Sequence, residues 1–535
     1  MTMRRNMVLE PLCNLLMDVA AWAPGLREIL HSDFMRVESL ARTRGTERIL
    51  MIEFPSLGKH LDKSLSSQYF ETGTLPAVFS KSYPFSCLLD RIFYDPWDKS
   101  ALQAGYIRSN PDENAVFFLR QILNLYKKVK IPCSPRSISV AVREFVEIDA
   151  NLREPTYCWN SVGTDPNEHQ ELLFGSRFSD IFTQEDDTDG LRDLTISKKA
   201  IGLLDSISGR IFQNIDLLDP MAIVPRHGPG AVADIKSGGD KYAFPSWGEK
   251  LSFCFPPELF RYSSEEISYL YPSENDTCTT SPAKLLAVPK TIDKPRLISE
   301  EPTANQFLQQ GLLRWIRQNL PYPLRRCIDF HSQVPSQELV LESSRTGSHA
   351  SVDLSSASDR LSCWTVERML RNFGGILPYL VCTRSSTIVD GTGTVDFGVL
   401  QLRKFAGQGS AVTFPVQSIC YAIVAIASYL QAFGLKPTYR NICKAAGKVR
   451  VFGDDIIVPV SCIPYLDVCL KLLQLKVNVA KSHYDGAFRE SCGMDGFEGY
   501  DVTPLYLSHT SPGTAPEEIT SWVDVSNNAH RKGLW

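Results

Sequence analysis

The chain has 535 residues and a formal net charge of −4 at pH 7, with 43% hydrophobic and 22% charged residues. This composition excludes a disordered chain, because a large core can be built, and the length is enough for three or four domain-sized units. The slightly acidic balance does not mark a nucleic-acid-binding protein, so contact with a polyanion would need locally concentrated basic groups and would be sensitive to salt.

Cysteine spacing and apolar runs exclude further classes of protein. The 14 cysteines are scattered without a Cys-x-x-Cys pair, which argues against a zinc site and against a disulfide framework. Near the N-terminus, Glu10 and Asp18 interrupt the apolar stretch that a signal peptide needs. The longest apolar run, residues 419–430, is too short to cross a bilayer, so we expect a soluble protein with no membrane partner.

The first part of the chain, up to about residue 155, combines helical patterns with proline-rich breaks. Apolar periodicity predicts helices at residues 9–21, 116–127 and 137–148. Farther on, residues 184–193 carry five acidic side chains and are typical of an exposed loop. A turn with glycine and proline follows at residues 226–230, and the histidine within it is best explained as structural.

The segment 284–296 concentrates basic side chains against one acidic neighbour, Asp293: Lys284, Lys290, Lys294 and Arg296. Lysine is a compact point charge for phosphate, whereas arginine can also stack on a base. We interpret Lys290 and Arg296 as the main candidates for a nucleotide channel. A solvated basic strand is the alternative, and the local charge alone would favour it.

Two aspartates six positions apart follow an apolar strand pattern within residues 350–359. The strand is predicted to end at Asp353, and a carboxylate in that place lies at the rim of a sheet. Small residues then turn the chain into a helical pattern, with Asp359 as the cap or in the first turn. Plain helix capping therefore competes as an explanation for Asp359, but it does not explain Asp353.

A glycine-rich loop and the start of an apolar helix occupy residues 407–418. Gly409 and Ser410 lie in the loop, where glycine allows the backbone to approach a ligand closely. Thr413 and Gln417 are four positions apart, so they share a helix face if the helix starts early enough. A loop and a buried helix with nothing bound is the alternative, and it would be preferred if this segment stood alone.

Residues 449–458 place two carboxylates on a tight turn between β-branched residues. Gly453 can adopt the backbone angles of a hairpin turn, from which Asp454 and Asp455 project out of an apolar sheet. An ordinary polar turn would explain this segment by itself. If the strand that ends at Asp353 lies beside the hairpin, however, the carboxylates converge, and such an arrangement suits two Mg²⁺ ions and in-line phosphoryl transfer.

In their order along the chain, these three elements resemble motifs A, B and C of RNA-dependent RNA polymerases. Three strings are more specifically similar to the replicases of the single-stranded RNA bacteriophages, the levivirus group: residues 353–359, 451–458 and 488–493, with 501–504 just after. The resemblance is strong from about residue 283 to 504, weaker upstream and thin before about residue 200.

The resemblance implies a role for each of these residues. Asp353 and Asp454 would be the principal ligands of two Mg²⁺ ions, with Mn²⁺ as the alternative ion, and Asp455 would assist them. Asp359 and Gln417 would lie near the incoming ribose and help to select its 2′-hydroxyl, although many such polymerases have Asn in place of Gln417. Further substrate contacts would come from Lys284, Lys290, Arg296, Gly409, Ser410 and Thr413.

A helix predicted at residues 465–475 precedes two lysines that compete for one role. Lys481 is similar in position to the lysine that protonates the departing pyrophosphate, and Lys476 is its rival. A solvated surface charge is the alternative explanation for either lysine. The family's motifs D and E would then lie within residues 465–493.

The fold implied is α+β, a right hand of palm, fingers and thumb around a channel. The palm would be an antiparallel sheet with helices on one face at residues 346–505, with a fingers insertion near 375–405. Residues 156–345 would form the fingers, and 1–155 would be a helical region that adds to thumb or fingers. Only a short segment, 506–535, follows the palm, so the thumb is either built by the N-terminal region or truncated.

The resemblance implies an enzyme that copies an RNA phage genome from ribonucleoside triphosphates on an RNA template, in the cytoplasm of a bacterial host. Its partners would be the host translation elongation factors Tu and Ts and a ribosomal protein. Two alternatives stay open. A reverse-transcriptase-like polymerase usually has a bulky aromatic where this chain has Asp359, and a degenerate polymerase kept as an RNA-binding protein would not need Asp353, Asp454 and Asp455.

Overall fold

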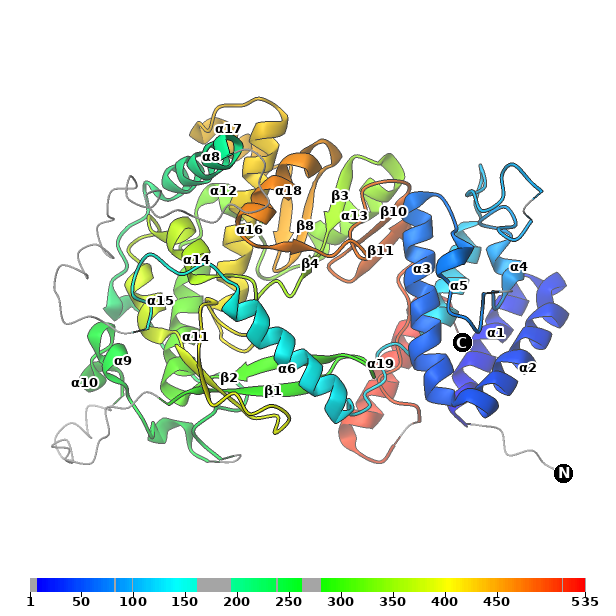
Figure 1. The fold of residues 1–535 in the computed structure, drawn as a ribbon, viewed down its shortest axis with the longest axis horizontal. Coiled ribbons are helices and arrows are strands. Elements are labelled where there is room, and N and C mark those ends of the chain that lie inside the picture. Colours follow the sequence, from blue (N-terminus) through cyan, green and yellow to red (C-terminus); the bar gives the residue numbers. More distant parts are fainter. Residues whose placement is uncertain are drawn as a thin grey trace.

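The computed structural model describes residues 7–80, 83–98, 100–160, 194–236, 239–261, 281–511 and 513–534. Helices and small, mostly antiparallel sheets alternate along the chain, so the α+β prediction is confirmed (Figure 1). The cysteines in the described part of the chain are free thiols. The acidic stretch predicted as a loop at residues 184–193 lies outside the described residues.

The helices that precede residue 130 gather at one end of the molecule (Figure 1). Their apolar faces enclose a core of leucine, isoleucine and phenylalanine side chains, which is what amphipathic periodicity achieves. The three helices predicted in the first part of the chain are observed, with ends shifted by a few residues. The helices are α1 (Glu10–Trp22), α2 (Arg27–Arg44), α3 (Phe54–Ser67), α4 (Ser86–Leu89), α5 (Glu113–Asn124) and, nearer the middle, α6 (Pro135–Ala150).

The basic segment forms a β-hairpin in a four-stranded sheet of order β2-β1-β5-β6. The central pair, β1 and β5, is parallel, and the outer pairs are antiparallel. Helix α6 covers this sheet through a small apolar core that includes Phe145, Leu285 and Ile388. The strands are β1 (Ala283–Pro289), β2 (Pro295–Glu300), β5 (Thr387–Asp390) and β6 (Val399–Gln401).

A second, antiparallel sheet of order β3-β8-β7 carries the aspartate motifs. Helix α16 packs against one face of this sheet, where Val352, Ile456 and Val458 belong to the main core. Strand β10 lies against the other face, where the N–H of Glu490 donates to Ser351 Oγ at 3.2 Å. The strands are β3 (His349–Val352), β7 (Arg450–Phe452), β8 (Asp455–Pro459) and β10 (Phe488–Ser491).

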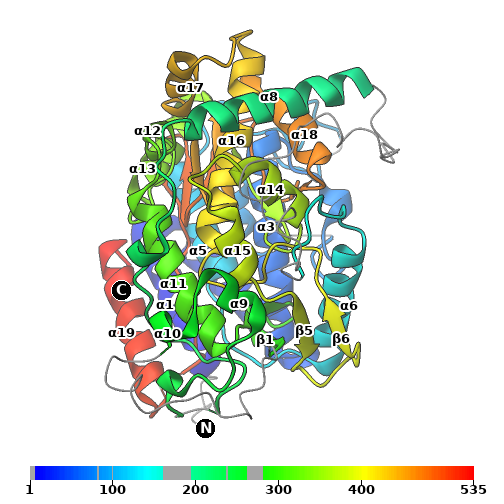
Figure 2. The same cartoon turned by 90° about the vertical axis from the view of Figure 1, so that its left-hand side faces the viewer.

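Helix α16 (Thr413–Ala432) is the centre of the main core. It begins six residues earlier than the apolar run at 419–430, so its 20 residues do meet the length and hydropathy of a membrane span, which corrects the sequence prediction. In this fold 94% of the apolar window is buried, and a helix that is apolar on all sides is expected in a protein core. Helix α8 crosses α16 (Figure 2), and the other helices next to α16 are α11, α14, α17 and α18.

The remaining elements connect or extend these layers. Strand β4 pairs with β9, and β10 continues into the sheet β10-β11-β12. The bounds are α8 (Leu194–Phe212), α9 (Glu249–Cys254), α10 (Pro257–Phe260), α11 (Thr303–Gln318), α12 (Tyr322–Arg325), α13 (Val334–Thr346), α14 (Cys363–Leu370), α15 (Leu377–Thr383), α17 (Tyr439–Ala446), α18 (Ile463–Leu472), β4 (Leu354–Ser355), β9 (Lys476–Val477), β11 (Met494–Phe497) and β12 (Tyr500–Asp501).

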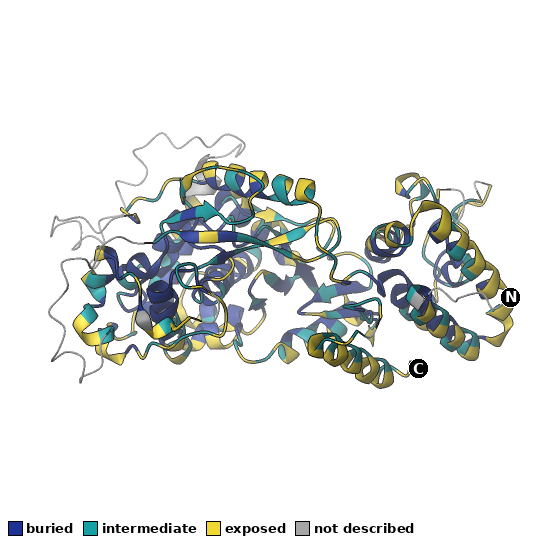
Figure 3. Ribbon diagram, turned by 90° about the horizontal axis from the view of Figure 1, so that it is seen from below, coloured by how far each residue is buried: buried dark blue, intermediate teal, exposed yellow. Residues whose placement is uncertain are grey.

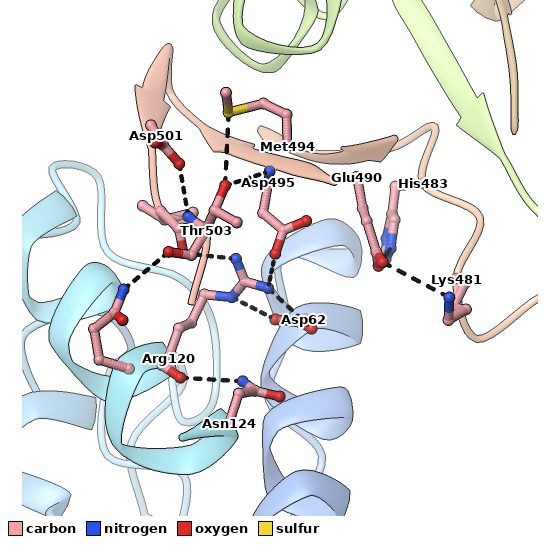
Figure 4. A network of polar contacts seen from close by, with 12 residues as sticks. Asp62, Arg120, Asn124, Lys481, His483, Glu490, Met494, Asp495, Asp501 and Thr503 are labelled. Carbon is pink, nitrogen blue, oxygen red and sulfur yellow. Dashed lines mark hydrogen bonds and ion pairs between the residues drawn. The ribbon is translucent and has the colours of Figure 1, made fainter. Parts of the chain in front are cut away.

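A buried ionic network joins the N-terminal helices to the C-terminal strands (Figure 4). Arg120 of α5 donates from Nε to Asp62 Oδ1 and from Nη2 to Asp495 Oδ2, both at 2.8 Å. Its Nη1 donates to the carbonyl oxygen of Val502 at 2.9 Å, and its guanidinium lies over the Phe488 ring. Each carboxylate of this junction therefore has a cationic partner.

The last described helix, α19 (Pro516–Arg531), has no fully buried residue (Figure 3). Its Trp522, Val525 and Ala529 face α1 and α5 across a mainly apolar cavity of about 320 Å³. The sequence pattern predicts only a short segment at these residues.

Candidate active site

The hairpin of β7 and β8 presents Asp454 and Asp455 at one end of the aspartate-bearing sheet. Phe452 pairs with Asp455 across the turn, and Gly453 has a φ of 64°. A Cβ at Gly453 would also crowd the ring of Phe414, so space as well as backbone angle favours glycine. The predicted hairpin is therefore confirmed, with its turn where the two carboxylates lie.

Helix α16 holds this turn in place. Ser418 Oγ accepts a hydrogen bond from the N–H of Gly453 at 3.0 Å. Gln417 is buried beside Gly453. The helix already begins at Thr413, so Thr413 lies one helical turn before Gln417 on the same helix. The shared helix face predicted for Thr413 and Gln417 is thus confirmed.

Strand β3 brings Asp353 to the same end of the sheet. The antiparallel register pairs Val352 with Ile456, so Asp353 follows the strand at the level of Asp455. Asp353 Oδ2 accepts a hydrogen bond from Asn478 Nδ2 at 2.7 Å, which fixes the orientation of the carboxylate. The strand that ends at Asp353 does lie beside the hairpin. The condition under which the carboxylates were expected to converge is therefore met.

The three carboxylates repel one another in the absence of a cation. Burial raises the pKa of Asp455 to about 7, and the charges of Asp454 and Asp353 contribute to that rise. Burial also raises the pKa of Asp353, with a further contribution from Asp454, against the opposing charge of Lys481. The N–H of Cys492 donates to Asp455 Oδ2 at 3.2 Å. This hydrogen bond lowers the pKa of Asp455, but by less than burial and the neighbouring charges raise it. Carboxylates that resist ionisation side by side favour the binding of a cation.

The chemistry of these donors fits Mg²⁺. Mg²⁺ prefers oxygen ligands and keeps several waters, so one or two carboxylates and the phosphates of a substrate complete its coordination. Within the described ranges, no three His, Cys, Asp or Glu side chains form a ready-made metal cage. Asp353, Asp454 and Asp455 are the residues that would hold the ion together with a substrate.

Lys481 lies at the edge of the carboxylate group, with Nζ 3.8 Å from Glu490 Oε1 (Figure 4). Burial lowers the pKa of Lys481, but Glu490 and the three site aspartates outweigh it and raise the pKa above its ordinary value. Lys481 is therefore a protonated group within reach of the carboxylates. Its rival Lys476 is exposed in β9, where it pairs with Ser355.

The tip of the β1–β2 hairpin adds basic groups to the site. Burial lowers the pKa of Lys290, and the charges of Arg296 and Lys481 lower it further, whereas the site aspartates oppose this shift. Lys290 and Arg296 thus share the electrostatic environment of the carboxylates. Lys284 lies near the start of β1, six residues before Lys290, which follows the end of that strand. Its predicted place among the substrate-binding residues stays a prediction.

The hairpin tip rests on the N-terminal helices, where Ile292 packs against their apolar core. Lys59 of α3 thereby comes within electrostatic reach of Lys294 and Lys481. Partial burial lowers the pKa of Lys59, and the charge of Lys127 lowers it further, as do those two lysines. A rim of basic side chains from separate segments therefore faces the carboxylates, although the chain as a whole is slightly acidic.

The glycine-rich loop lies directly on strand β2. A Cβ at Gly409 would clash with the backbone of Ser299, and Gly409 has a φ of 131°. The close approach that this glycine permits is thus to protein, whereas the sequence pattern suggested a ligand. Thr413 closes the loop by donating from Oγ1 to the Gly407 carbonyl at 2.9 Å. Ser410 is buried nearby, and its Oγ has no hydrogen-bond partner among the described residues.

Asp359 is held by a buried lysine and caps no helix. Helix α14 begins at Cys363, and its N-cap is Ser362, whose Oγ accepts a hydrogen bond from the N–H of Thr365 at 3.2 Å. Asp359 lies in the preceding turn, where Lys404 Nζ donates to its Oδ1 at 3.1 Å. The predicted capping role is therefore wrong, and a tertiary ion pair takes its place.

Comparison with known proteins adds an independent observation. Residues 263–512 match the family described as RNA replicase, beta-chain. The match covers a little under half of the chain. The matched range contains every element that brings the three aspartates together, from the β1–β2 hairpin to β10.

Individual relatives agree with the family match. The chain is 32% identical over 264 residues to the RNA-directed RNA polymerase subunit beta of Escherichia virus Qbeta, which covers 47% of this chain and 39% of that protein. It is 32% identical over 223 residues to the RNA-directed RNA polymerase beta chain of Escherichia phage MS2, covering 42% and 37%. For the beta chain of Enterobacteria phage GA the identity is 34% over 226 residues, covering 42% and 38%. The matched segment thus spans well under half the length of these replicase subunits.

The replicase segment contains supporting residues that sequence reasoning missed. Asn478 orients Asp353, Ser418 holds Gly453, and Lys404 holds Asp359. Glu490 joins the charges around Lys481. A polar residue next to an apolar helix or strand is the only sequence signal that any of them carries, and that signal does not identify the partner.

Proposed function

We propose that this protein is a template-directed RNA polymerase that copies the genome of an RNA bacteriophage from ribonucleoside triphosphates. The observation that carries the proposal is the meeting of Asp353 with Asp454 and Asp455 at one end of the β3-β8-β7 sheet. That meeting occurs inside the segment that matches the RNA replicase beta-chain family. The polymerase names of the phage relatives support the same activity.

Each group around the carboxylates has a task in this proposal. Two Mg²⁺ ions held by the three aspartates would activate the attacking 3′-hydroxyl and neutralise charge on the phosphates. Lys290 and Arg296 bind the triphosphate of the incoming nucleotide. The hydroxyl attacks the α-phosphorus, the bond to the β-phosphate oxygen breaks, and Lys481 donates a proton to the departing pyrophosphate. The raised pKa of Lys481 keeps that proton available at neutral pH.

We extend the proposal to a right-hand architecture. The β3-β8-β7 sheet with α16 would be the palm, and the sheet of the basic hairpin the fingers. Docking of Ile292 on the N-terminal helices supports these helices as the opposite wall of the channel. The predicted ranges, 1–155 for the helical region, 156–345 for the fingers, 346–505 for the palm with its insertion near 375–405, and 506–535 for the C-terminal segment, stay predictions.

The partners also belong to the proposal. An RNA template and the nascent RNA would lie along the basic rim, inside a bacterial host cell. Host elongation factors Tu and Ts and a ribosomal protein stay expectations from the family resemblance.

Incorporation of labelled ribonucleotides on an RNA template with Mg²⁺ tests the proposal. The purified chain is compared with Asp454→Asn and with Asp467→Asn, which removes an exposed carboxylate that pairs with Lys471 on α18 at 2.7 Å. We expect synthesis by the unmodified chain and by Asp467→Asn, and none by Asp454→Asn. Full synthesis by Asp454→Asn would contradict the assignment of the metal site.

Two further arms separate the alternatives. Deoxyribonucleotides offered in place of ribonucleotides would be incorporated by a reverse-transcriptase-like enzyme and refused by the proposed one. If the purified chain is silent, addition of bacterial extract supplies a host partner. Silence that persists with extract, together with retained RNA binding, would favour a degenerate polymerase relative.

A further inference from the structure

Lys404 is a completely buried cation beside Asp359. Its side chain has 0% exposure, and its Nζ lies 3.1 Å from Asp359 Oδ1 and 3.3 Å from the centroid of the Phe145 ring. Among the described residues, Asp359 is the only carboxylate within 4.0 Å of this ammonium group. Burial of an ammonium group is costly unless it is paired, so the fold is strongly constrained to keep Lys404 against Asp359.

Helix α6 fixes Lys404 from the other side. The carboxylate of Asp149 accepts hydrogen bonds from the N–H groups of Arg403 and Lys404, each at 3.0 Å. Arg403 donates in addition to the carbonyl oxygen of Ala150 at 2.7 Å. Phe145, which packs on the Lys404 ammonium, lies one turn before Asp149 on the same helix. Backbone and side chain of Lys404 are thus both set by α6, which lies outside the segment matched to the replicase family.

One carboxylate oxygen of Asp359 forms an ion pair, and the other has no hydrogen-bond partner among the described residues. Its side chain is 21% exposed, Oδ1 is bound by Lys404, and Oδ2 has no protein partner among the described residues. The turn that carries it is tied to α16, because the Tyr421 hydroxyl donates to the Ala357 carbonyl at 2.9 Å. Burial raises the pKa of Tyr421, and the charges of Asp454 and Asp359 contribute, so both carboxylates approach the same part of α16. Gln417 lies one turn before Tyr421 on this helix.

We propose that Lys404 is a positioning residue that aims the free oxygen of Asp359 at the 2′-hydroxyl of the incoming ribose, and thereby sets the preference for ribonucleotides. The inference rests on the proposed polymerase function and deepens it. A charge-assisted hydrogen bond fixes the orientation of a carboxylate, and an oriented carboxylate accepts a hydrogen bond from the 2′-hydroxyl only if the substrate has that hydroxyl. A 2′-deoxyribonucleotide leaves that oxygen unpaired, so discrimination depends on the ion pair and, through it, on α6.

The test compares the efficiency, kcat/KM, of ATP with that of 2′-deoxyATP on one RNA template. Lys404→Met keeps the length of the side chain and removes its charge. We expect the ratio of the two efficiencies to fall roughly 10- to 100-fold, mostly through ATP, because a hydrogen bond to a charged group loses its alignment. Asp359→Asn should lower the ratio similarly, and the double variant should lose little more.

Two matched variants control for folding and for the general loss of a lysine. Lys471→Met removes a lysine from an exposed pair with Asp467 and should leave the ratio unchanged. Lys404→Arg keeps a cation at the buried position and should restore part of the ratio. If Lys404→Met does not fold, Asp149→Asn takes its place, because it loosens the backbone of Lys404 and should lower the same ratio.

The outcomes separate this inference from the proposed function. Equal losses for ATP and 2′-deoxyATP in Lys404→Met would mean a merely structural lysine and would overturn the inference, while the polymerase stands. An unmodified chain that incorporates both nucleotides equally well would overturn it too. Equilibrium binding of the two nucleotides with Mg²⁺ is measured alongside, so an unmodified chain that neither incorporates nor binds ATP contradicts both proposals.

Discussion

Two buried groups of charges in this molecule differ in whether their carboxylates contact a cationic side chain. At the junction of the N-terminal helices, Arg120 contacts both Asp62 and Asp495 at 2.8 Å, so the two carboxylates share one buried cation, although burial still raises the pKa of Asp495. At the end of the β3-β8-β7 sheet, by contrast, Asp353, Asp454 and Asp455 lie close enough for their charges to repel, and the pKa of Asp455 is raised to about 7. The nearest cations, Lys481 and Lys290, stand at the rim.

This difference separates a charge cluster that serves the fold from one that serves a ligand. A buried pair that is complete within the protein holds two segments together and has no need of anything else. A group of like charges is unfavourable in the empty protein and becomes favourable only when a cation binds.

The largest expected effect is on the compensated cluster. Arg120→Met leaves Asp62 and Asp495 buried without their cation, and removal of one partner from a buried pair costs about 3–5 kcal/mol. Denaturant unfolding measures the loss. The matched control is Arg42→Met, which removes an exposed pair with Glu38 and should cost less than about 1 kcal/mol. Equal costs for the two variants would show that the junction is not a structural element.

Asp455→Asn should act in the opposite direction on stability. Without Mg²⁺, loss of one of three crowded charges should raise the free energy of unfolding at pH 8 by about 1–3 kcal/mol. The same variant should lose ribonucleotide incorporation by roughly 100-fold or more, because electrostatic stabilisation at the reacting phosphate is lost. If Asp455→Asn is less stable and fully active, the three aspartates serve the fold and not a ligand, and the difference between the two clusters is contradicted.

His483 lies beside Glu490 (Figure 4), and its buried ring should make stability depend on pH. Burial lowers its pKa to about 4, so its ring is neutral at pH 7 despite Glu490 at 3.9 Å. The unfolded chain takes up the proton near 6.5. The stability contributed by the neutral ring is therefore complete above that pH and is lost as pH falls towards 4, by about 2 kcal/mol at pH 5.

Comparison of unfolding at pH 7 and pH 5 measures this contribution. His483→Gln should show a smaller difference between the two conditions than the unmodified chain. His331→Gln, at an exposed position, should behave like the unmodified chain. An unchanged pH dependence in His483→Gln would contradict the burial argument.

The smallest expected effect concerns the basic rim. Lys59→Ala should raise the KM for ribonucleotides about 2- to 5-fold with little change in kcat, because a rim cation contributes equally to substrate and transition-state binding. Lys63→Ala removes an equally exposed lysine from the same helix, so it is the matched control and should have no effect. The effect should shrink at high salt, as expected for charges in solvent.

Local backbone chemistry explains which parts of the site could be predicted. Gly453 between β-branched residues specifies a hairpin by its own conformational freedom, so the turn and its carboxylates follow from a few neighbouring residues. The strand before Asp353 and most of the helices follow from periodicity in the same way. The α+β class could be predicted for that reason, together with the order of the three motifs.

Tertiary pairing explains what could not be predicted. Arg120 and Asp495 are 375 positions apart, and Lys404 and Asp359 are 45 apart, so nothing local identifies either pair. Asp359 looks like a helix cap in the sequence, because small residues and an apolar pattern surround it. The fold overrides that signal by supplying Ser362 as the cap.

The most direct test of the central claim maps where a divalent cation binds. Fe²⁺ bound in place of Mg²⁺ generates hydroxyl radicals with ascorbate and peroxide, and the radicals cleave the backbone close to the metal. We predict cleavage near residues 353 and 454, suppressed by Mg²⁺ and absent in Asp454→Asn, with none near residues 62 and 495. Cleavage at the Arg120 junction, or cleavage near 353 and 454 that persists in Asp454→Asn, would contradict the account.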